Sequence, residues 1–373
     1  MRVLIDAHML GHRETGNETY VRGLITGLAS IDGISVAAAI EPGQQPALPG
    51  SVTLLPLPDR SSWRRLAGEF ATLCRNWQAD VAQATYIAPY RLPCPVIVSV
   101  HDVSFRRFPQ FFSVRDRALF SIMLPGSLRR AAAILTLSSH AREELDRFYP
   151  GNQAKTHVVP AAPAEASRPL DAAVADSVVA KNGLRRPFLL AVGSLQPRKN
   201  LVRLIEAYAQ LRKTHPAVQL VIVGPGGFQS SQVRDAIIER DLSTSVRWLG
   251  YVSDDDLVAL YNAAKALVYP SVYEGFGLPV VEAMACGCPV IAANTSSLPE
   301  VVGDAGLLVD PFQVSSLQSA MERLVIDTEL AHTLRTRGLA RAATFSWRRS
   351  AEAALAAFRQ ACRTPAGGRA TRK

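Results

Sequence analysis

Short apolar runs alternate with helix-like segments along most of the chain, and this alternation limits the folds open to it. In the first half the runs are continuously apolar, as expected for parallel strands buried on both faces. They cover Arg2–Ala7, Ser35–Ile40, Val52–Leu57, Pro95–Val100 and Ala133–Leu137. Helical patterns lie between several of them, at Thr19–Ala29, Arg115–Arg130 and Ala141–Phe148. This order predicts an α/β fold built on a doubly wound sheet.

The alternation starts again after a stretch rich in alanine and proline, Val158–Pro187, whose composition is typical of an interdomain linker. Five further strands are predicted at Phe188–Val192, Gln219–Val223, Val246–Leu249, Ala266–Tyr269 and Pro289–Ala293. The helices between them are predicted at Leu201–Thr214, Ser231–Arg240 and Asp254–Ala264. We therefore expect a first domain over residues 1–165, a linker over 166–187 and a second domain over 188–346.

The length and composition fit this division. A chain of 373 residues has room for two or three domains, and 48% hydrophobic with 20% charged residues is typical of soluble globular proteins. The N-terminal apolar run is short and contains an acid, so it predicts a strand and not a signal peptide. No run reaches the roughly 18 apolar residues that a membrane-spanning helix needs. We therefore expect a cytoplasmic protein.

The net charge of +9 calls for a partner of negative charge or a membrane surface. Between residues 60 and 130, eleven arginines against four acids give +7. Four phenylalanines, Phe105, Phe108, Phe111 and Phe112, are interleaved there with Arg106, Arg107, Arg115 and Arg117. Such a patch could lie on an anionic bilayer at the inner face of the membrane, or it could be an aromatic core edge with solvated arginines. No nucleic-acid recognition motif accompanies the arginines, so no nucleic-acid partner is expected.

No metal site is predicted. Asp254, Asp255 and Asp256 could form a metal-binding triplet, but Ser253 followed by these acids and an apolar pattern is typical of a capped helix start. The five cysteines lack metal-ligand spacing, and Cys286-Gly-Cys288 is interpreted as packed small thiols and not as a redox motif.

One segment, Tyr-Glu-Gly-Phe-Gly-Leu-Pro-Val-Val-Glu at Tyr273–Glu282, combines two carboxylates with a glycine-broken loop and a helix start. Gly275 and Gly277 leave backbone N–H groups open to a ligand, and Pro279 suits the first turn of a helix. A polyol bound here would find the carboxylate of Glu274 and bare amides. The alternative is an ordinary loop that enters a helix and carries two solvated glutamates.

A second segment, Gly-Ser-Leu-Gln-Pro-Arg-Lys-Asn at Gly193–Asn200, follows a predicted strand and opens a helix. The fork of Arg198 beside the point charge of Lys199 could hold a diphosphate. Cations at a helix start are otherwise unfavourable against the helix dipole, so a bound anion explains them better than a solvated surface does.

Two positions in the first half are also candidates. His101 follows the predicted strand, where ligands of open α/β sheets bind. A capping or core histidine is the alternative. The segment Gly11–Tyr20 after the first strand is neither a P-loop nor a Gly-x-Gly-x-x-Gly motif, so Gly16 is either part of a ligand loop or a plain turn.

Glu-Gly-Phe-Gly-Leu-Pro-Val-Val-Glu, followed by Ala-Met-Ala-Cys-Gly-Cys-Pro-Val-Ile-Ala, closely resembles the donor-sugar motif of the retaining, family-four glycosyltransferases of the GT-B fold. The resemblance is strongest over residues 186–347. It implies two Rossmann-like domains facing across a cleft, of which the first binds the acceptor and the second the nucleotide-sugar donor. It also implies no essential metal or cofactor, and a C-terminal helix over 347–362 that crosses back to the first domain. The basic tail, 363–373, is expected to be disordered.

The resemblance also implies roles. Glu274 and His101 are the catalytic candidates: Glu274 would orient hydroxyls of the donor sugar, and His101 would contact that sugar near its reacting carbon. Glu282 would bind the ribose, and Arg198 and Lys199 would hold the diphosphate, since Ser194 stands where the family often has an arginine. The other implied donor-binding residues are Gly16, Ser194, Val252, Gly275, Phe276, Gly277 and Leu278.

A nucleotide-sugar is the common ligand that needs a diphosphate site and a polyol site together. We therefore predict transfer of a sugar, with retained configuration, from a nucleotide diphosphate to a hydroxyl of a saccharide or lipid-linked acceptor. Asn-Thr-Ser-Ser-Leu-Pro-Glu with Pro-Arg-Lys-Asn resembles bacterial mannosyltransferase-like members, which makes GDP-mannose the expected donor. A nucleotide-sugar 2-epimerase of the same fold and a non-catalytic sugar-nucleotide-binding subunit stay open as alternatives.

Overall fold

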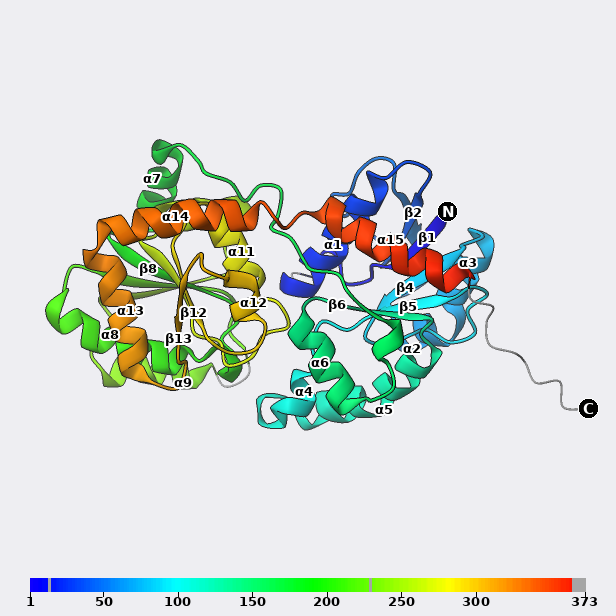
Figure 1. Cartoon of the computed structure of the whole chain (residues 1–373), viewed down its shortest axis with the longest axis horizontal. Coiled ribbons are helices and arrows are strands. Elements are labelled where there is room, and N and C mark those ends of the chain that lie inside the picture. Colours follow the sequence, from blue (N-terminus) through cyan, green and yellow to red (C-terminus); the bar gives the residue numbers. More distant parts are fainter. Residues whose placement is uncertain (13–14, 228–229, 364–373) are drawn as a thin grey trace, which may run out of the picture. The chain divides into compact units, whose positions relative to one another are not determined.

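The computed structural model describes residues 1–12, 15–227 and 230–363 (Figure 1). It divides into two compact units. The first contains Met1–Pro109, Ser113–Ala162 and the chain from Ser346 onward, and the second contains Gln110–Phe112 and Pro163–Phe345.

The sheet of the first unit has seven parallel strands in the order β3-β2-β1-β4-β5-β6-β7. They are β1 (Arg2–Asp6), β2 (Ser35–Ile40), β3 (Thr53–Pro56), β4 (Val81–Thr85), β5 (Val96–Ser99), β6 (Ala133–Thr136) and β7 (Thr156–Val158). In the centre Leu4 pairs with Ala37 on one side and Ala82 on the other, and all three are buried. Burial on both faces explains why these strands have continuous apolar runs.

The helical segments of this part of the chain are α1 (Thr15–Ala29), α2 (Ser62–Arg64), the π-helix η1 (Arg65–Glu69), α3 (Phe70–Asn76), α4 (Ser104–Arg107), η2 (Pro109–Phe111), α5 (Val114–Arg130), α6 (Ser139–Phe148), η3 (Gln153–Lys155) and α15 (Trp347–Arg363). Helix α15 packs along α1, and Arg348 near the start of α15 donates to Ser30 O, just beyond the end of α1, 318 residues away in the sequence. Two glycines make this possible, because a Cβ at Gly23 would lie 2.1 Å from the ring of Trp347 and one at Gly27 would lie 2.3 Å from its carbonyl oxygen.

The sheet of the second unit has six parallel strands in the order β10-β9-β8-β11-β12-β13. They are β8 (Phe188–Val192), β9 (Gln219–Val223), β10 (Val246–Gly250), β11 (Ala266–Tyr269), β12 (Val290–Ala293) and β13 (Leu307–Val309). The helical segments are α7 (Ala172–Lys181), η4 (Pro197–Lys199), α8 (Leu201–Thr214), α9 (Ser231–Glu239), α10 (Asp254–Ala263), α11 (Leu278–Ala285), α12 (Leu298–Val302), α13 (Val314–Ile326) and α14 (Thr328–Ala342).

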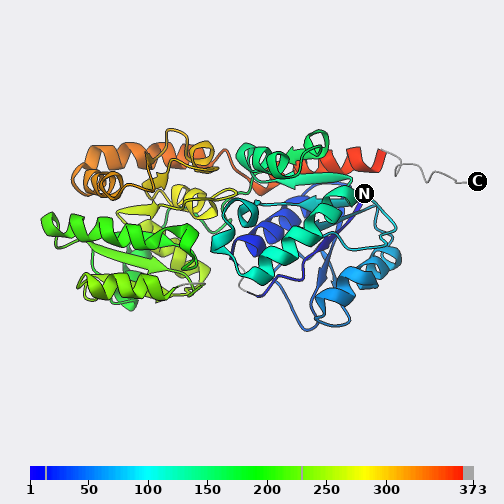
Figure 2. The ribbon, with the colours of Figure 1, turned by 90° about the horizontal axis from the view of Figure 1, so that it is seen from below.

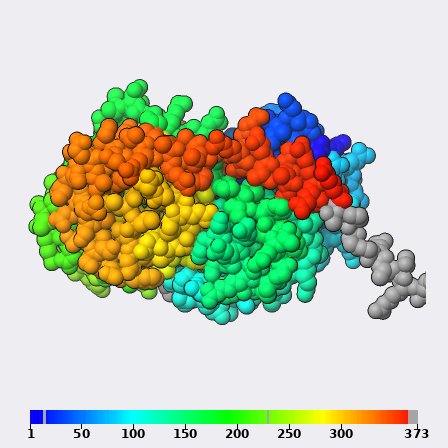
Figure 3. Space-filling model, viewed as in Figure 1, coloured from blue at the N-terminus to red at the C-terminus, as the bar shows by residue number. Residues whose placement is uncertain are grey.

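Two groups of helices cover this second sheet (Figures 1 and 2). Helices α8, α9 and α13 pack together around a core that includes Leu204, Tyr208 and Met321. Helices α7, α10, α11 and α14 form the other group. In the space-filling view α13 and α14, in orange, cover much of the visible face of this unit (Figure 3).

The predicted linker over 166–187 differs from the structure. Its residues belong to the second unit and include helix α7, which packs against α10. The side chain of Asn262 in α10 binds the segment before α7, donating to Arg168 O at 3.0 Å and accepting from Leu170 N at 2.8 Å. Ala175 and Val179, one helical turn apart, are buried, so part of the predicted linker forms the buried face of a helix.

The predicted tail begins at Arg363, which is the last residue of α15, and the rest of that prediction, 364–373, lies outside the described residues. Strands β4, β7 and β13 were not predicted. Strand β4 carries the buried Gln83, whose amide donates to Ser99 Oγ at 2.9 Å. This polar residue interrupts the apolar run by which the other strands were predicted.

Candidate active site

Three charged side chains meet at the carboxyl edge of the second sheet. Glu274 Oε2 accepts from Arg198 Nη1 at 2.8 Å, and Glu274 Oε1 accepts from Lys199 Nζ at 2.6 Å. Glu274 is 6% exposed and Lys199 7%. The structure therefore joins the two segments that the sequence analysis singled out separately, although they lie 75 residues apart in the chain.

Local structure positions each member of this triad. Arg198 and Lys199 lie in η4, which begins at Pro197 after β8 and ends at Asn200, whose φ of 59° is left-handed. The amide of Asn200 donates to Pro270 O at 3.1 Å and Pro311 O at 2.6 Å, which fixes this turn. The N–H of Val272 donates to Arg198 O at 2.8 Å, so the loop after β11 is bound directly to η4.

The ionisation of Glu274 follows from its partners. Burial by itself raises the pKa of this carboxyl, but Arg198 and Lys199 outweigh burial and bring the pKa down to about 2. The triad therefore carries one net positive charge at neutral pH. Tyr269 OH also donates to Glu274 Oε1, at 3.0 Å, because burial and the adjacent carboxylate raise the pKa of this phenol well above its usual value.

The loop after Glu274 contains a backbone conformation that glycine adopts readily and other residues adopt rarely. Gly277 has a φ of 105°, and a Cβ there would lie 2.7 Å from Leu298 Cδ2, so only glycine fits before α11. Ser297 is buried and its hydroxyl donates to the carbonyl oxygens of Glu274 and Phe276, both at 3.0 Å. Phe276 is buried, with its ring edge-on to that of Phe345 at 5.5 Å between centroids. Only the backbone of this residue can take part in binding.

Glu282 lies in α11 in different surroundings. Its Oε2 accepts from Tyr261 OH at 3.2 Å. Although part of its surface remains accessible, burial raises the pKa of this carboxyl to about 7. The bond from Tyr261 partly opposes that rise, and the negative charge of Asp254 adds to it.

The remaining donor-binding candidates lie in turns. Ser194 is in the loop between β8 and η4, where Gly224 approaches so closely that a Cβ would lie 2.1 Å from Gly193 O. Val252 is half-buried between β10 and α10. Gly16 is exposed in the first turn of α1, and a Cβ there would meet no atom of the described residues within 4 Å, so none of them requires glycine at this position.

His101 lies in the first unit, just beyond β5, and is 6% exposed. Its Nδ1 is 2.7 Å from Asn17 Oδ1, and its ring meets Tyr20 edge-on at 4.5 Å and Tyr86 at 5.7 Å between centroids. Burial lowers the pKa of the imidazole to about 3, so it is neutral. With Asn17 Oδ1 as acceptor, Nδ1 carries the proton, and Nε2 keeps a lone pair that has no hydrogen-bond partner among the described residues.

Four residues of these sites were not predicted: Asn17, Tyr261, Tyr269 and Ser297. Tyr269 had a usable signal, because it is the last residue of a predicted strand. The others act only through contacts that distant elements bring together, and no local pattern indicates them.

The acidic triplet caps a helix, as predicted. Ser253 Oγ accepts from Asp256 N at 3.2 Å, and Asp256 pairs with Lys181 Nζ at 2.8 Å. Cys286 and Cys288 are buried, as predicted for packed thiols. Among the residues that the structure describes, no group of three or more His, Cys, Asp or Glu side chains is arranged to hold a metal ion.

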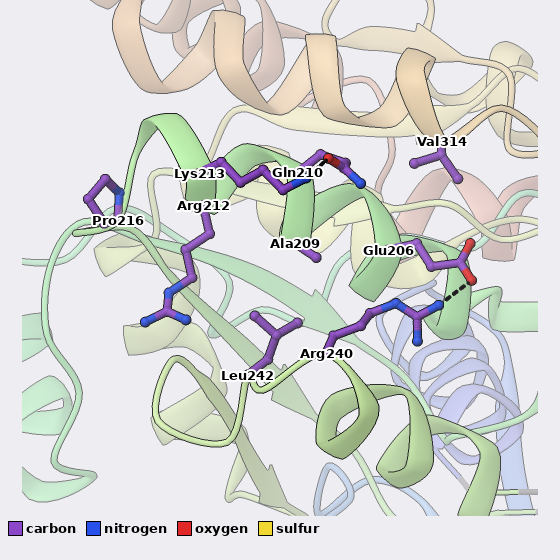
Figure 4. Close-up of a pocket in the computed structure, with 9 residues that line it drawn as sticks. All are labelled: Glu206, Ala209, Gln210, Arg212, Lys213, Pro216, Arg240, Leu242 and Val314. Atoms are coloured by element: carbon purple, nitrogen blue, oxygen red, sulfur yellow. Dashed lines mark hydrogen bonds and ion pairs between the residues drawn. The ribbon is translucent and has the colours of Figure 1, made fainter.

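A surface depression of about 690 Å³ runs beside α8, away from these residues (Figure 4). Gln210, Arg212 and Lys213 of α8 line it together with Arg240, which is paired with Glu206 at 2.8 Å. Because neither the Arg198–Lys199–Glu274 triad nor Glu282 lines it, it is separate from the candidate active site.

Comparison with known proteins identifies the family. The family model described as "Glycosyltransferase Family 4" matches residues 15–162, and "Glycosyl transferases group 1" matches residues 176–341. The O-antigen chain mannosyltransferase B of Escherichia coli is 36% identical over 274 residues, which cover 70% of this chain and 69% of that protein. The chain belongs to the family 4 glycosyltransferases.

Another mannosyltransferase and two solved structures are also similar to this family 4 glycosyltransferase. The serotype-specific mannosyltransferase WbdA of E. coli is 34% identical over 236 residues, 61% of this chain but only 29% of that protein. Among solved structures, sucrose-phosphate synthase from Thermosynechococcus elongatus has a TM-score of 0.79 at 23% identity, covering 96% of this chain and 98% of that one. Anabaena HepE, solved in complex with UDP-glucose, has a TM-score of 0.74 at 19% identity, covering 95% and 99%. These structures confirm the predicted GT-B fold.

Proposed function

We propose that this glycosyltransferase moves mannose from GDP-mannose to an acceptor hydroxyl, with retained anomeric configuration and without an essential metal. The Arg198–Lys199–Glu274 triad is the observation that carries this proposal, because one site supplies cations for a diphosphate and an ionised carboxylate for sugar hydroxyls. The mannosyltransferases of E. coli at 36% and 34% identity support mannose as the sugar.

In the proposed reaction the cations stabilise the charge that develops on the leaving diphosphate, a kind of electrostatic contribution that is usually large in catalysis. The side chain of Arg198 is 20% exposed against 9% for Lys199, so Arg198 is the more accessible to a ligand. Glu274 holds hydroxyls of the sugar, and Glu282 holds the ribose. His101 accepts a hydrogen bond from the sugar at its free Nε2.

A panel of nucleotide sugars tests this function directly. The protein is incubated with each donor, and free nucleoside diphosphate is measured with and without a saccharide acceptor. GDP-mannose should release GDP fastest, and the anomeric configuration of the product should match that of the donor by NMR. An epimerase would instead yield the 2-epimer, and a binding subunit would bind GDP-mannose without releasing GDP.

Metal independence is tested in the same assay. Asp254–Asp256 form the first turn of α10, so we expect EDTA to leave the rate of GDP release unchanged. Complete loss of activity in EDTA that manganese restores would contradict this part of the proposal.

We also propose an anionic membrane surface as a partner. Phe105 is buried against Phe120, with 5.3 Å between ring centroids, so it belongs to the core edge and not to a membrane patch. The exposed apolar side chains lie instead on α5, where Val114 and Ile122 are 76% and 74% exposed beside the exposed Arg115 and Arg117.

No helix among the described residues is both long and apolar enough to span a bilayer. Attachment would therefore be peripheral, with each cation contributing about 1 kcal/mol near an anionic surface. Binding to anionic liposomes should fall as salt is raised. Equal, negligible binding to anionic and neutral vesicles would remove the membrane from the proposal.

A further inference from the structure

A charged cluster in the first unit has no part in the function proposed above. It consists of Asp6, the last residue of β1; His8, two residues later; and Arg65, the first residue of the π-helix η1. Asp6 is 1% exposed and Arg65 8%. Asp6 Oδ1 lies 2.9 Å from His8 Nδ1, and Asp6 Oδ2 accepts a hydrogen bond from Arg65 Nη1.

The position of this cluster in the sheet favours a ligand site. From β1 the chain builds the sheet outward through β2 and β3 on one side, then returns to place β4 on the other side of β1. In open α/β sheets, ligands bind beyond the carboxyl ends of the strands where the strand order reverses in this way. Asp6 and His8 lie at the carboxyl end of β1, which is one of the two strands at that point.

The backbone conformation beside the cluster also favours a ligand site. Arg65 begins η1, a five-residue π-helix between α2 and α3. Such segments are rare, and they are frequent at functional sites. Here the segment begins with a buried arginine whose side chain donates to Asp6 at the end of β1.

The contacts determine what the cluster can bind. Burial opposes ionisation of Asp6, but His8 and Arg65 together hold the pKa of this carboxyl at about 2. The ionised carboxylate accepts the hydrogen bond of His8 Nδ1–H, so Nε2 is the ring nitrogen that is left for a ligand. The charges of Asp6 and Arg65 cancel, which favours a neutral hydroxyl ligand over a phosphate. The side chain of His8 is 28% exposed, so a ligand can reach it.

We propose that His8, oriented by Asp6 and Arg65 at the carboxyl end of β1, accepts a hydrogen bond from a hydroxyl of the acceptor saccharide. This inference rests on the proposed glycosyl transfer and names part of its acceptor site. His8 contacts the substrate, and Asp6 and Arg65 are positioning residues.

The chain offers a matched control. His12 also pairs with a carboxylate, Glu41, at 2.9 Å, and it lies at the same edge of the sheet. Its bond uses Nε2 and not Nδ1, and its side chain is 37% exposed. Arg60, which lies 3.5 Å from Glu41 Oε2, has a side chain that is 66% exposed. His12→Leu therefore removes a comparable pair without touching the proposed site.

The experiment uses the full chain, GDP-mannose and methyl α-D-mannopyranoside as the acceptor probe. His8→Leu should raise KM for the mannoside about tenfold, the effect of one lost hydrogen bond. GDP binding by calorimetry and GDP release in the absence of acceptor should not change. His8→Gln, whose side-chain oxygen can reach the place of Nε2, should recover part of the loss. His12→Leu should match the wild type.

Asp6→Asn adds a second readout. It should raise KM for the mannoside and also lower the unfolding temperature, because Arg65 loses its buried counter-ion. The proposal is overturned if His8→Leu keeps the wild-type KM, if it weakens GDP binding in parallel, or if the wild type is not saturated by the mannoside. If the wild type neither binds GDP nor releases it from GDP-mannose, glycosyl transfer itself is contradicted and this inference falls with it.

Discussion

Glu274 and Glu282 belong to one short segment, yet the fold gives them opposite properties. Glu274 lies between two cations and has a pKa of about 2, whereas Glu282 lies against Tyr261 inside a helix and has a pKa of about 7. Both are removed from water to a large degree, so burial alone does not explain the difference. The difference arises because Arg198 and Lys199 lie beside Glu274 and lower its pKa, whereas the charge that acts on Glu282 is the negative one of Asp254, which raises its pKa.

The comparison suggests that Glu274 is an electrostatic element of the triad and Glu282 is a titratable binding group. Glu274 cannot lose its charge at physiological pH without separating from Arg198 and Lys199. Glu282 can gain or lose a proton as a ligand arrives.

The largest effect is expected from Glu274→Gln. The positive charge that develops on the sugar in the transition state loses its carboxylate, so kcat should fall about tenfold to hundredfold while GDP affinity hardly changes. The neutral amide also leaves the 7%-exposed Lys199 without its counter-ion, so the unfolding free energy should fall by about 3 kcal/mol. Steady-state kinetics, calorimetry with GDP and thermal unfolding measure the three quantities.

Glu282→Gln should act on binding. The ribose does not change during the reaction. Loss of the Glu282 carboxylate should therefore raise KM for the donor and weaken GDP binding by about tenfold, with little change in kcat. The Glu274→Gln protein is the matched control in the same calorimetry. If Glu274→Gln weakens GDP binding and Glu282→Gln lowers kcat, the two roles are reversed.

The pH dependence of GDP binding separates the two carboxyls further. Below pH 7 Glu282 is mostly protonated, so a ribose that needs the carboxylate must displace a proton. Between pH 6 and pH 8 the ionised fraction of a group with a pKa of about 7 rises about tenfold, and GDP should bind correspondingly more tightly. GDP itself titrates in this range, so the test is the difference between the wild type and Glu282→Gln. Equal pH profiles for the two proteins would exclude this role.

The smallest effects are expected from the two tyrosines. Tyr261→Phe removes a hydrogen bond that favours the ionised form of Glu282, so the midpoint of the pH profile should move upward and GDP affinity near pH 7 should fall a few-fold, about what one hydrogen bond contributes. Tyr269→Phe removes a bond to Glu274, which keeps both cations, so that midpoint should stay where it is. A shift of similar size in both variants would show that the two sites are not independent.

The strands that were predicted with correct bounds share one property. Ser35–Ile40 in the first sheet and Phe188–Val192, Gln219–Val223 and Ala266–Tyr269 in the second all pair with a strand on both sides, and their apolar runs follow from burial on both faces. Strand β4 and helix α7 were missed because Gln83 finds its partner on the adjacent strand and the face of α7 is buried only by α10. In both cases the element is stabilised by a residue or helix elsewhere in the chain, which the local sequence pattern does not contain.

The chemical groups of the site, and the turns that can present them, could be predicted from the sequence. The left-handed Gly277 before a helix, the adjacent Arg198 and Lys199, and the two glutamates are all visible as local patterns, because backbone conformation and residue type are local properties. Only the tertiary structure decided that the cations pair with Glu274, that Tyr261 meets Glu282, and that Asp6 orients His8. The ionisation of a buried group depends on charges and hydrogen bonds through space, and those neighbours come from residues far away in the chain.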